Sequence, residues 1–280
     1  TLSLTLFSMK FVALVSGGKD SCYNILHCIR QGHELVALAN LHPLDESLQE
    51  LDSFMFQTVG HDIVSHYGKC TGLPLFRHQI KAQSSKNVSL NYYPTKDDEI
   101  EDLYQLLKDV KNELPDVQAV SVGAILSSYQ RTRVEDVCGR LGLTVLSYLW
   151  HRDQLELMTE MCSMSKLEGE EEQPKMDARL IKVAAVGLDA THLGKSLPQV
   201  FPTLQKLNNM YEVHICGEGG EFETMVLDAP FFTKGRLNVE STQLVSSRNN
   251  DGVYNIQLNV KFFERGLDVS VEDGLRNLAV

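Results

Sequence analysis

The sequence predicts an α/β fold: a parallel sheet with helices on both faces, followed by a smaller C-terminal α+β domain. Two observations lead to this prediction. Over the first half of the chain, short apolar runs alternate with segments of helical periodicity, which is typical of βαβ units and a parallel sheet. Near the C-terminus, two segments of alternating apolar and polar residues flank Asn249–Gly252, a turn sequence typical of an antiparallel hairpin.

Length and composition exclude several classes of protein. The chain has 280 residues, a formal net charge of −11 and 43% apolar residues. This length favours about two domains, and the apolar share is sufficient for a globular core. No run approaches the roughly 18 apolar residues of a membrane span. We therefore do not expect a membrane protein. Because an acidic chain repels a phosphate backbone, we also do not expect a general nucleic-acid binder, although a local basic patch is still compatible with this charge.

The cysteines indicate a reducing compartment. None of the six belongs to a C-x-x-C pair, and they are scattered along the chain. This pattern disfavours a zinc ribbon, a thioredoxin-like motif and a disulfide framework. The first eight residues lack the basic region of a signal peptide, and Met9 is a candidate natural start. We therefore expect a cytoplasmic protein whose cysteines are mostly buried thiols.

The first predicted domain spans residues 9–150. We expect strands at 11–15, 34–39, 73–78, 119–123 and 144–147; the first is a short, continuous apolar run, which is typical of a fully buried parallel strand. Helices are expected at 20–31, 52–69, 97–111 and 132–141. The clearest helix is 97–111, which has acidic residues at its start, lysines at its end and an apolar stripe of Ile100, Leu103, Leu107 and Val110. Ligands of such sheets bind at the carboxyl ends of the strands.

The second half of the chain begins after a break near Trp150. In the predicted domain 151–235 we expect a strand at 181–186, a helix at 198–211 and a strand at 213–216. Both prolines of that helix should lie near its beginning. Residues 166–177 are charged and contain glycine and proline, which favours a solvated loop. Residues 236–280 should form the hairpin, with strands at 237–244 and 253–263, and a weakly ordered tail.

The glycine turn at residues 16–21 is the most informative motif. It reads Ser16-Gly17-Gly18-Lys19-Asp20-Ser21 and joins a predicted buried strand to a helix. Glycines let the backbone approach a phosphate closely, and the amides of the helix N-terminus point at the anion. Asp20 is suited to hold Mg²⁺ beside the phosphates, and Lys19 adds a positive charge. The turn is neither a Walker loop nor a Rossmann glycine motif. The simpler alternative is a strand-to-helix turn capped by Ser16 and Asp20.

The same turn resembles the signature of the N-type ATP pyrophosphatases, which split ATP between the α- and β-phosphates. The resemblance implies an adenine nucleotide alpha hydrolase-like (HUP-like) fold, with a loop that holds the pyrophosphate. It also implies that Ala39, at the end of the second strand, lies near the adenine. The cofactors implied are ATP and Mg²⁺.

Three further segments narrow the resemblance to one family. Together with the turn, residues 50–61, 121–135 and 216–224 resemble the diphthine–ammonia ligases, and the likeness extends from about Met9 to Pro230. In that family the reaction is ATP-dependent amidation of diphthine on translation elongation factor 2. Ammonium is the nitrogen donor, the intermediate is an acyl-adenylate, and the products are diphthamide, AMP and pyrophosphate.

Several residues are candidates for contacting the nucleotide. Gly123 ends a predicted strand, where a missing side chain would let AMP approach closely. Arg131 and Arg133 follow at a predicted helix start, so one of them is a candidate ligand of the α-phosphate. The alternative for these arginines is a solvated helix face.

A second glycine turn lies within residues 216–224 and carries three glutamates, so its charge is negative and not suited to a phosphate. Glutamates suit a cation, and the trimethylammonium group of diphthine is recognised by carboxylates and aromatic faces. Glu221 and Glu223 are also candidates to accept a proton from ammonium. The alternative is a structural turn whose acids face water. The expected substrate-binding residues are Glu218, Gly219, Gly220, Glu221, Phe222, Glu223 and Trp150.

Two rival functions differ in class. A transfer-RNA-modifying member of the same superfamily would bring paired cysteines or a basic surface, and this chain has neither a C-x-x-C pair nor a positive balance. A non-enzymatic adenine nucleotide-binding protein has no need for Asp20 or for the second turn. A glutaminase domain has no room, so free ammonium is the expected donor. The oligomeric state is left open.

Overall fold

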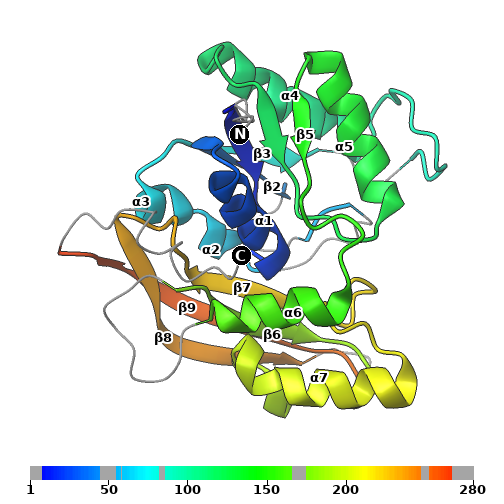
Figure 1. The fold of residues 1–280 in the computed structure, drawn as a ribbon, viewed down its shortest axis with the longest axis vertical. Helices are drawn as coiled ribbons and strands as arrows, with labels where there is room; N and C mark the ends of the chain where they lie inside the picture. Colours follow the sequence, from blue (N-terminus) through cyan, green and yellow to red (C-terminus); the bar gives the residue numbers. More distant parts are fainter. Residues whose placement is uncertain are drawn as a thin grey trace, which may run out of the picture. The chain divides into compact units, whose positions relative to one another are not determined.

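A computed structural model describes residues 8–44, 55–57, 59–81, 86–165, 175–246 and 252–266 (Figure 1). The chain divides into two compact units. Unit 1 takes its described residues from 1–16, 20–61 and 73–150. Unit 2 takes them from 17–19, 62–72 and 151–280. Two short N-terminal segments, one of them within the first glycine turn, thus belong to unit 2.

Unit 1 is built on a parallel sheet, as predicted. Its strands are β1 (Lys10–Leu14), β2 (Glu34–Pro43), β3 (Leu75–Ile80), β4 (Ala119–Ser121) and β5 (Thr144–Leu146). Their order is β3-β2-β1-β4-β5, and every pair is parallel. The chain runs outward from β1 in both directions, so the crevice at the carboxyl ends of β1 and β4 is where such a sheet binds ligands.

Helices cover both faces of this sheet (Figure 1). Val12 belongs to an apolar cluster with residues of α4 (Glu99–Glu113) and α5 (Ser128–Leu141). Successive strand residues point to opposite faces, so Ala13 and its β4 partner Ser121 face the other side. There Asn24 of α1 (Lys19–Arg30) donates a hydrogen bond to the Ser121 hydroxyl. Both α4 and α5 begin at side-chain caps, Asp98 and Ser127.

The helix predicted at 52–69 is wrong where the structure describes it. Residues 55–57 are not helical, and two short helices follow instead, α2 (His61–Val64) and α3 (Tyr67–Thr71). Gly60 has a φ of 78°, which a continuous helix does not accommodate. The buried apolar residues that follow Gly60 in this segment lie on two short helices and not on one long helix. Residues 52–54 and 58 lie outside the described residues.

Unit 2 contains the predicted second α+β domain. Its sheet comprises β6 (Asp177–Val183), β7 (Phe222–Asp228), β8 (Gly235–Ser246) and β9 (Tyr254–Glu264), in the order β7-β6-β9-β8. All three pairings are antiparallel. The predicted hairpin pairs from Gly235 with Glu264 to Ser246 with Tyr254, and it shares the sheet with β6 and β7. Most of its turn lies outside the described residues, as do 166–174 and 267–280 of the predicted loop and tail.

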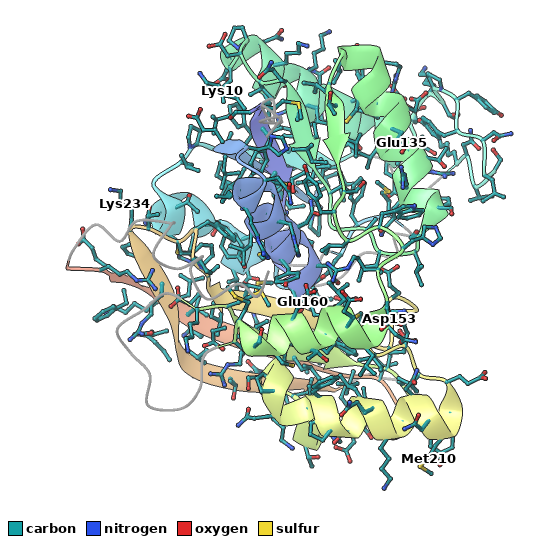
Figure 2. The ribbon with its side chains drawn as sticks, in the orientation of Figure 1. Lys10, Glu135, Asp153, Glu160, Met210 and Lys234 are labelled. Carbon is teal, nitrogen blue, oxygen red and sulfur yellow. The ribbon has the colours of Figure 1, made fainter. Side chains whose placement is uncertain are left out.

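The helices of unit 2 differ from the prediction in two ways. Helix α6 (Gln154–Ser163) was not predicted; it begins at Asp153, whose side chain accepts hydrogen bonds from two backbone amides of its first turn (Figure 2). Helix α7 (Leu197–Tyr211) includes Pro202 in its interior, not at its beginning. The helix continues past Pro202 because Leu204 and Leu207 remain packed in the core. A short 3₁₀ turn, η1 (Ala190–His192), precedes α7.

The strand predicted at 213–216 is also wrong. Its apolar residues are buried, yet the segment is irregular. The Ile215 amide donates to the Gln154 side chain of α6 and not to a strand. The strand of this region is β7, which begins within the second glycine turn. Among the described residues, no helix has the length and apolarity that crossing a bilayer requires.

Candidate functional site

The first glycine turn lies directly after β1, and α1 begins at Lys19. Gly17 has a φ of 89°, a backbone conformation that favours glycine. A Cβ at Gly17 would lie 2.7 Å from the Met225 sulfur and 2.9 Å from a Val64 methyl group. Conformation and space therefore both require glycine here, which is how a backbone is brought close to its neighbours.

Strand β7 holds the middle of this turn through hydrogen bonds. The Gly17 carbonyl accepts from the Val226 amide at 2.8 Å, and the Lys19 amide donates to Thr224 Oγ1 at 2.9 Å. The buried Tyr67 hydroxyl lies 2.6 Å from the Val226 carbonyl and 3.2 Å from the Gly17 carbonyl. Residues 17–19 are thus fixed at both ends by one strand, at Gly17 through the main chain of Val226 and at Lys19 through the Thr224 hydroxyl.

The side chain of Lys19 points to the second glycine turn. It is only 3% exposed, and its Nζ donates to the Cys216 carbonyl at 2.5 Å. The same ammonium lies 5.3 Å from the centroid of the Phe222 ring. A carbonyl oxygen and an aromatic face both stabilise a positive charge. The structure therefore brings Lys19 together with both ends of the turn predicted to bind the acceptor.

In unit 1 the loop after β4 lies against the first turn of α1. A Cβ at Gly123 would lie 2.5 Å from the Asp20 carbonyl carbon and 2.5 Å from the Ser21 amide nitrogen. These are backbone atoms, which cannot rotate away. Ser16 Oγ lies 3.4 Å from Ser21 Oγ and 3.5 Å from Gln57 Oε1. The structure places Gly123 beside the helix start, at the edge of the sheet where ligands bind.

Asp20 is the residue predicted to hold a metal ion. It is the second residue of α1 and is partly exposed. Among the described residues, no three His, Cys, Asp or Glu side chains gather into a metal-binding group. Mg²⁺ bound with phosphates takes only one or two protein carboxylates, together with phosphate oxygens and water. A single carboxylate beside a turn suited to an anion fits this requirement.

Ala39 contributes to the sheet. Its side chain is fully buried in the apolar cluster of β2, α4 and α5, and its carbonyl accepts a hydrogen bond from the Val15 amide. The side chain of Ala39 is therefore not accessible to a ligand.

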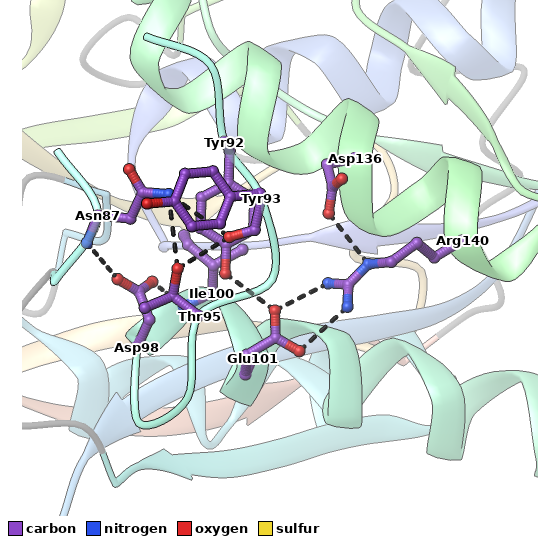
Figure 3. Close-up of polar contacts among 9 residues, drawn as sticks. All are labelled: Asn87, Tyr92, Tyr93, Thr95, Asp98, Ile100, Glu101, Asp136 and Arg140. Carbon is purple, nitrogen blue, oxygen red and sulfur yellow. Dashed lines mark hydrogen bonds and ion pairs between the residues drawn. The ribbon is translucent and has the colours of Figure 1, made fainter. Parts of the chain in front are cut away.

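Arg133 braces a loop of unit 1. It is fully buried, and its guanidinium donates to the carbonyls of Asn87 and Ser89 while lying 3.3 Å from the centroid of the Tyr129 ring. The braced loop is also held by Asp98, whose carboxylate accepts from the Asn87 amide at 2.9 Å (Figure 3). These contacts give Arg133 a structural role and leave its guanidinium buried, away from solvent.

Arg131 and Trp150 form a pair in unit 1. The guanidinium carbon of Arg131 lies 4.6 Å from the centroid of the Trp150 ring, and its Nε pairs with Glu135 at 2.6 Å. The Arg131 side chain is 34% exposed, so it remains accessible to an anion. Trp150 and Phe222, the two aromatic residues predicted to face the substrate cation, therefore each face a cation of the protein.

The acids of the second glycine turn have different partners. The Glu221 carboxylate accepts from the His214 amide at 3.0 Å and from the Gly219 amide at 2.7 Å, which closes the turn. Glu223 Oε1 lies 3.5 Å from Lys182 Nζ. Glu218 is half-buried in the turn, whose flanking glycines, Gly217 and Gly220, have φ values of 76° and 81°. Glu221 thus shapes the turn.

Sequence reasoning missed several residues of this region. Tyr67 and Thr224 fix the first turn, although Thr224 lies at the end of the segment 216–224 and Tyr67 lies within the predicted helix 52–69. A cavity of about 400 Å³ in unit 1 was also not predicted. It lies beside the carboxyl-terminal halves of β2 and β3, and its lining residues are His42, Arg77, His78, Gln79, Lys81, Asp102 and Gln105.

Comparison with known proteins gives a consistent result over both units. Residues 9–145 match the family model of the Diphthamide synthase N-terminal domain, and residues 166–262 match that of the Diphthamide synthase C-terminal domain. A diphthine–ammonia ligase of Danio rerio is 52% identical over 239 residues, which are 85% of this chain and 89% of that protein. The Homo sapiens diphthine–ammonia ligase is 50% identical over 240 residues, 85% of each chain.

Fungal relatives are longer. The Saccharomyces cerevisiae diphthine–ammonia ligase is 61% identical over 267 residues, which cover 94% of this chain and 38% of the yeast protein. The Schizosaccharomyces pombe relative is 50% identical, and 38% of its length is covered. The chain thus spans well under half the length of these two fungal relatives.

Proposed function

The chain belongs to the diphthine–ammonia ligase family, and from this premise we propose that it is an ATP-dependent ligase that amidates diphthine on translation elongation factor 2. The observation that carries the proposal is the hydrogen bond from Lys19 Nζ to the Cys216 carbonyl. It joins an anion-binding turn to the turn that we assign to the acceptor. Activation and acceptor recognition are then coupled through one side chain.

The chemistry explains why both turns are needed. A carboxylate does not react with ammonia at neutral pH, because its oxygen is a poor leaving group. In the proposed reaction the diphthine carboxylate attacks the α-phosphate of ATP and pyrophosphate leaves. Ammonia then attacks the acyl carbon, AMP leaves, and the nitrogen loses a proton. Fixed positive charges near the phosphates lower the barrier, because charge builds up there in the transition state.

The residues present fit a phosphate chain. Gly17 and Gly18 give a turn without side chains, and the turn leads directly into α1, a helix of 12 residues whose N-terminus carries a partial positive charge. Lys19 adds the positive charge of the turn. Of the two arginines predicted to contact the α-phosphate, Arg131 is the one that is accessible. Asp20 would hold Mg²⁺, which neutralises phosphate charge when bound.

The second turn supplies negative charge for the acceptor. Glu221 keeps the turn closed through its two backbone contacts. We assign recognition of the trimethylammonium group to Glu218 and Glu223, because a quaternary ammonium donates no ordinary hydrogen bond and is held by charge and aromatic faces. Glu223 would do so next to Lys182, which leaves its net charge partly balanced.

Sulfur transfer to RNA is the less favoured alternative. All six cysteines are free thiols, and burial raises the pKa of Cys28, Cys70, Cys138 and Cys162 to about 12. Sulfur-transfer cysteines need a lowered pKa, because the thiolate is the nucleophile. Free thiols also support the proposed cytoplasmic location.

The test is a product assay with ATP, ammonium and elongation factor 2 carrying diphthine. We expect AMP and pyrophosphate in equal amounts, and neither product when the factor lacks diphthine. Formation of ADP, or of pyrophosphate without the factor, would contradict the proposed reaction. Full dependence on an added RNA would favour the alternative.

A further inference from the structure

The end of β1 poses a hydrogen-bonding problem. Val15 follows the last residue of β1 and is almost fully buried, and its amide still donates to the Ala39 carbonyl at 2.9 Å. The chain then leaves the sheet to form the phosphate-binding turn. A buried carbonyl at this point needs a donor, because leaving it unsatisfied is costly.

A side chain of β2 supplies the donor. Asn40 Nδ2 donates to the Val15 carbonyl at 2.8 Å, and Asn40 is 3% exposed. Asn40 Oδ1 in turn accepts from Arg77 Nε at 3.1 Å. Asn40 and Arg77 are register partners in the pairing of β2 with β3. The amide orientation is therefore unique: its NH₂ faces a carbonyl and its oxygen faces a guanidinium.

Arg77 is itself fixed in unit 1. Its second donor group, Nη2, contacts the His61 carbonyl at 2.9 Å. The guanidinium thus bridges β2 and the segment at the start of α2. A planar guanidinium with two fixed partners holds Asn40 in one rotamer.

We propose that Asn40 and Arg77 are positioning residues that set the geometry of the phosphate-binding turn for ATP; this inference rests on the proposed function. The peptide group is planar and trans, so fixing the Val15 carbonyl also fixes the direction of the Ser16 amide, the first amide of the turn. Neither residue needs to touch the nucleotide. They act through the peptide between Val15 and Ser16.

The test compares two identical substitutions. Asn40→Asp keeps the size of the side chain and its contact with Arg77 but replaces the donor to Val15 with an oxygen. Asn208→Asp makes the same change where the side-chain amide donates to the Val213 carbonyl, after α7 in unit 2. The dissociation constant of a non-hydrolysable ATP analogue is measured by calorimetry, and folding is checked by circular dichroism and urea unfolding.

We expect Asn40→Asp to weaken analogue binding about tenfold or more, as for the loss of a buried hydrogen bond. Asn208→Asp should lower stability and leave binding unchanged. Equal binding by Asn40→Asp and the wild type, or equal weakening in both variants, would overturn the positioning role. A wild-type protein that does not bind the analogue would instead overturn the proposed function. If Asn40→Asp does not fold, Arg77→Lys, which retains the Asn40 donor but not the planar guanidinium, should weaken binding several-fold.

Discussion

Lys19 donates a hydrogen bond from its ammonium group to the main-chain carbonyl of Cys216, 197 positions away in the sequence. One residue lies in a turn suited to phosphate, and the other begins a turn rich in glutamates. In the proposed reaction these turns bind opposite charges, an anionic nucleotide and a cationic acceptor. Because the Lys19 side chain connects the two turns, a change in the conformation of one turn is expected to shift the other.

Removing the Lys19 charge should stop activation. We expect Lys19→Met to lower the rate of pyrophosphate release at least about 100-fold, as for the loss of one preorganised donor at a transition-state charge. The matched control is Lys10→Met, because Lys10 is a half-exposed lysine paired with Asp116 at the start of β1. Its rate should equal that of the wild type. A Lys19→Met protein with more than a tenth of the normal rate would contradict this role.

Adding one methyl group at Gly123 should push the loop after β4 away from the start of α1. The new Cβ would meet backbone atoms of Asp20 and Ser21, so we expect Gly123→Ala to cost about 1–3 kcal/mol of unfolding free energy and to weaken ATP binding. Gly139→Ala is the control, because a Cβ there meets no atom within 4 Å on helix α5. It should raise stability by roughly 0.5–1 kcal/mol. Urea unfolding measures both, and a neutral Gly123→Ala would refute the contact.

The second turn should matter for the acceptor and not for ATP. Glu221→Ala removes the acceptor of two backbone amides, so we expect amidation to fall about tenfold or more while binding of an ATP analogue is unchanged. Glu218→Gln keeps the turn and removes one charge, and it should raise the KM for the diphthine-bearing factor. Amidation that survives both substitutions would exclude this turn from the acceptor site.

Stability should fall in mild acid because of His33. Its Nδ1 accepts from the Met9 amide and its Nε2 contacts the Tyr148 hydroxyl, and burial holds the pKa of His33 below its usual value. The unfolded chain then binds more protons just below pH about 6.5, so the free energy of unfolding decreases as the pH falls through that range. Urea unfolding at pH 7.5 and 5.5 should show a smaller decrease for His33→Gln than for the wild type. Equal decreases would assign the effect to other groups.

Local signals explain why much of unit 1 could be predicted. Helix α4 begins at a cap visible in the sequence, Asp98. Helix α5 was expected to begin at Thr132, but it begins four residues earlier, after the Ser127 cap, and it ends before Gly142. Residues 11–15 are a continuous apolar run, which predicts the buried strand β1. The first glycine turn could be placed at the end of a strand, because it directly follows this apolar run.

Other features depend on contacts between distant segments. Strand β7 begins at Phe222, which has a glutamate on each side, so its start does not read as an apolar run. Its pairing with β6 makes this segment a strand. Arg133 looked like a phosphate ligand because of its neighbours in sequence, yet the loop at 86–98 surrounds its guanidinium. Asn40 and Tyr67 became visible only when the hydrogen bonds of the turn could be followed.

We propose that this chain transfers nitrogen from ammonium to diphthine at the expense of ATP. The most direct measurement is mass spectrometry of elongation factor 2 carrying diphthine after incubation with the protein, ATP and ¹⁵N-ammonium. We expect one ¹⁵N amide on the diphthine residue for each AMP formed, and no label with Lys19→Met. AMP formed without label in the factor, or label incorporated without ATP, would contradict it.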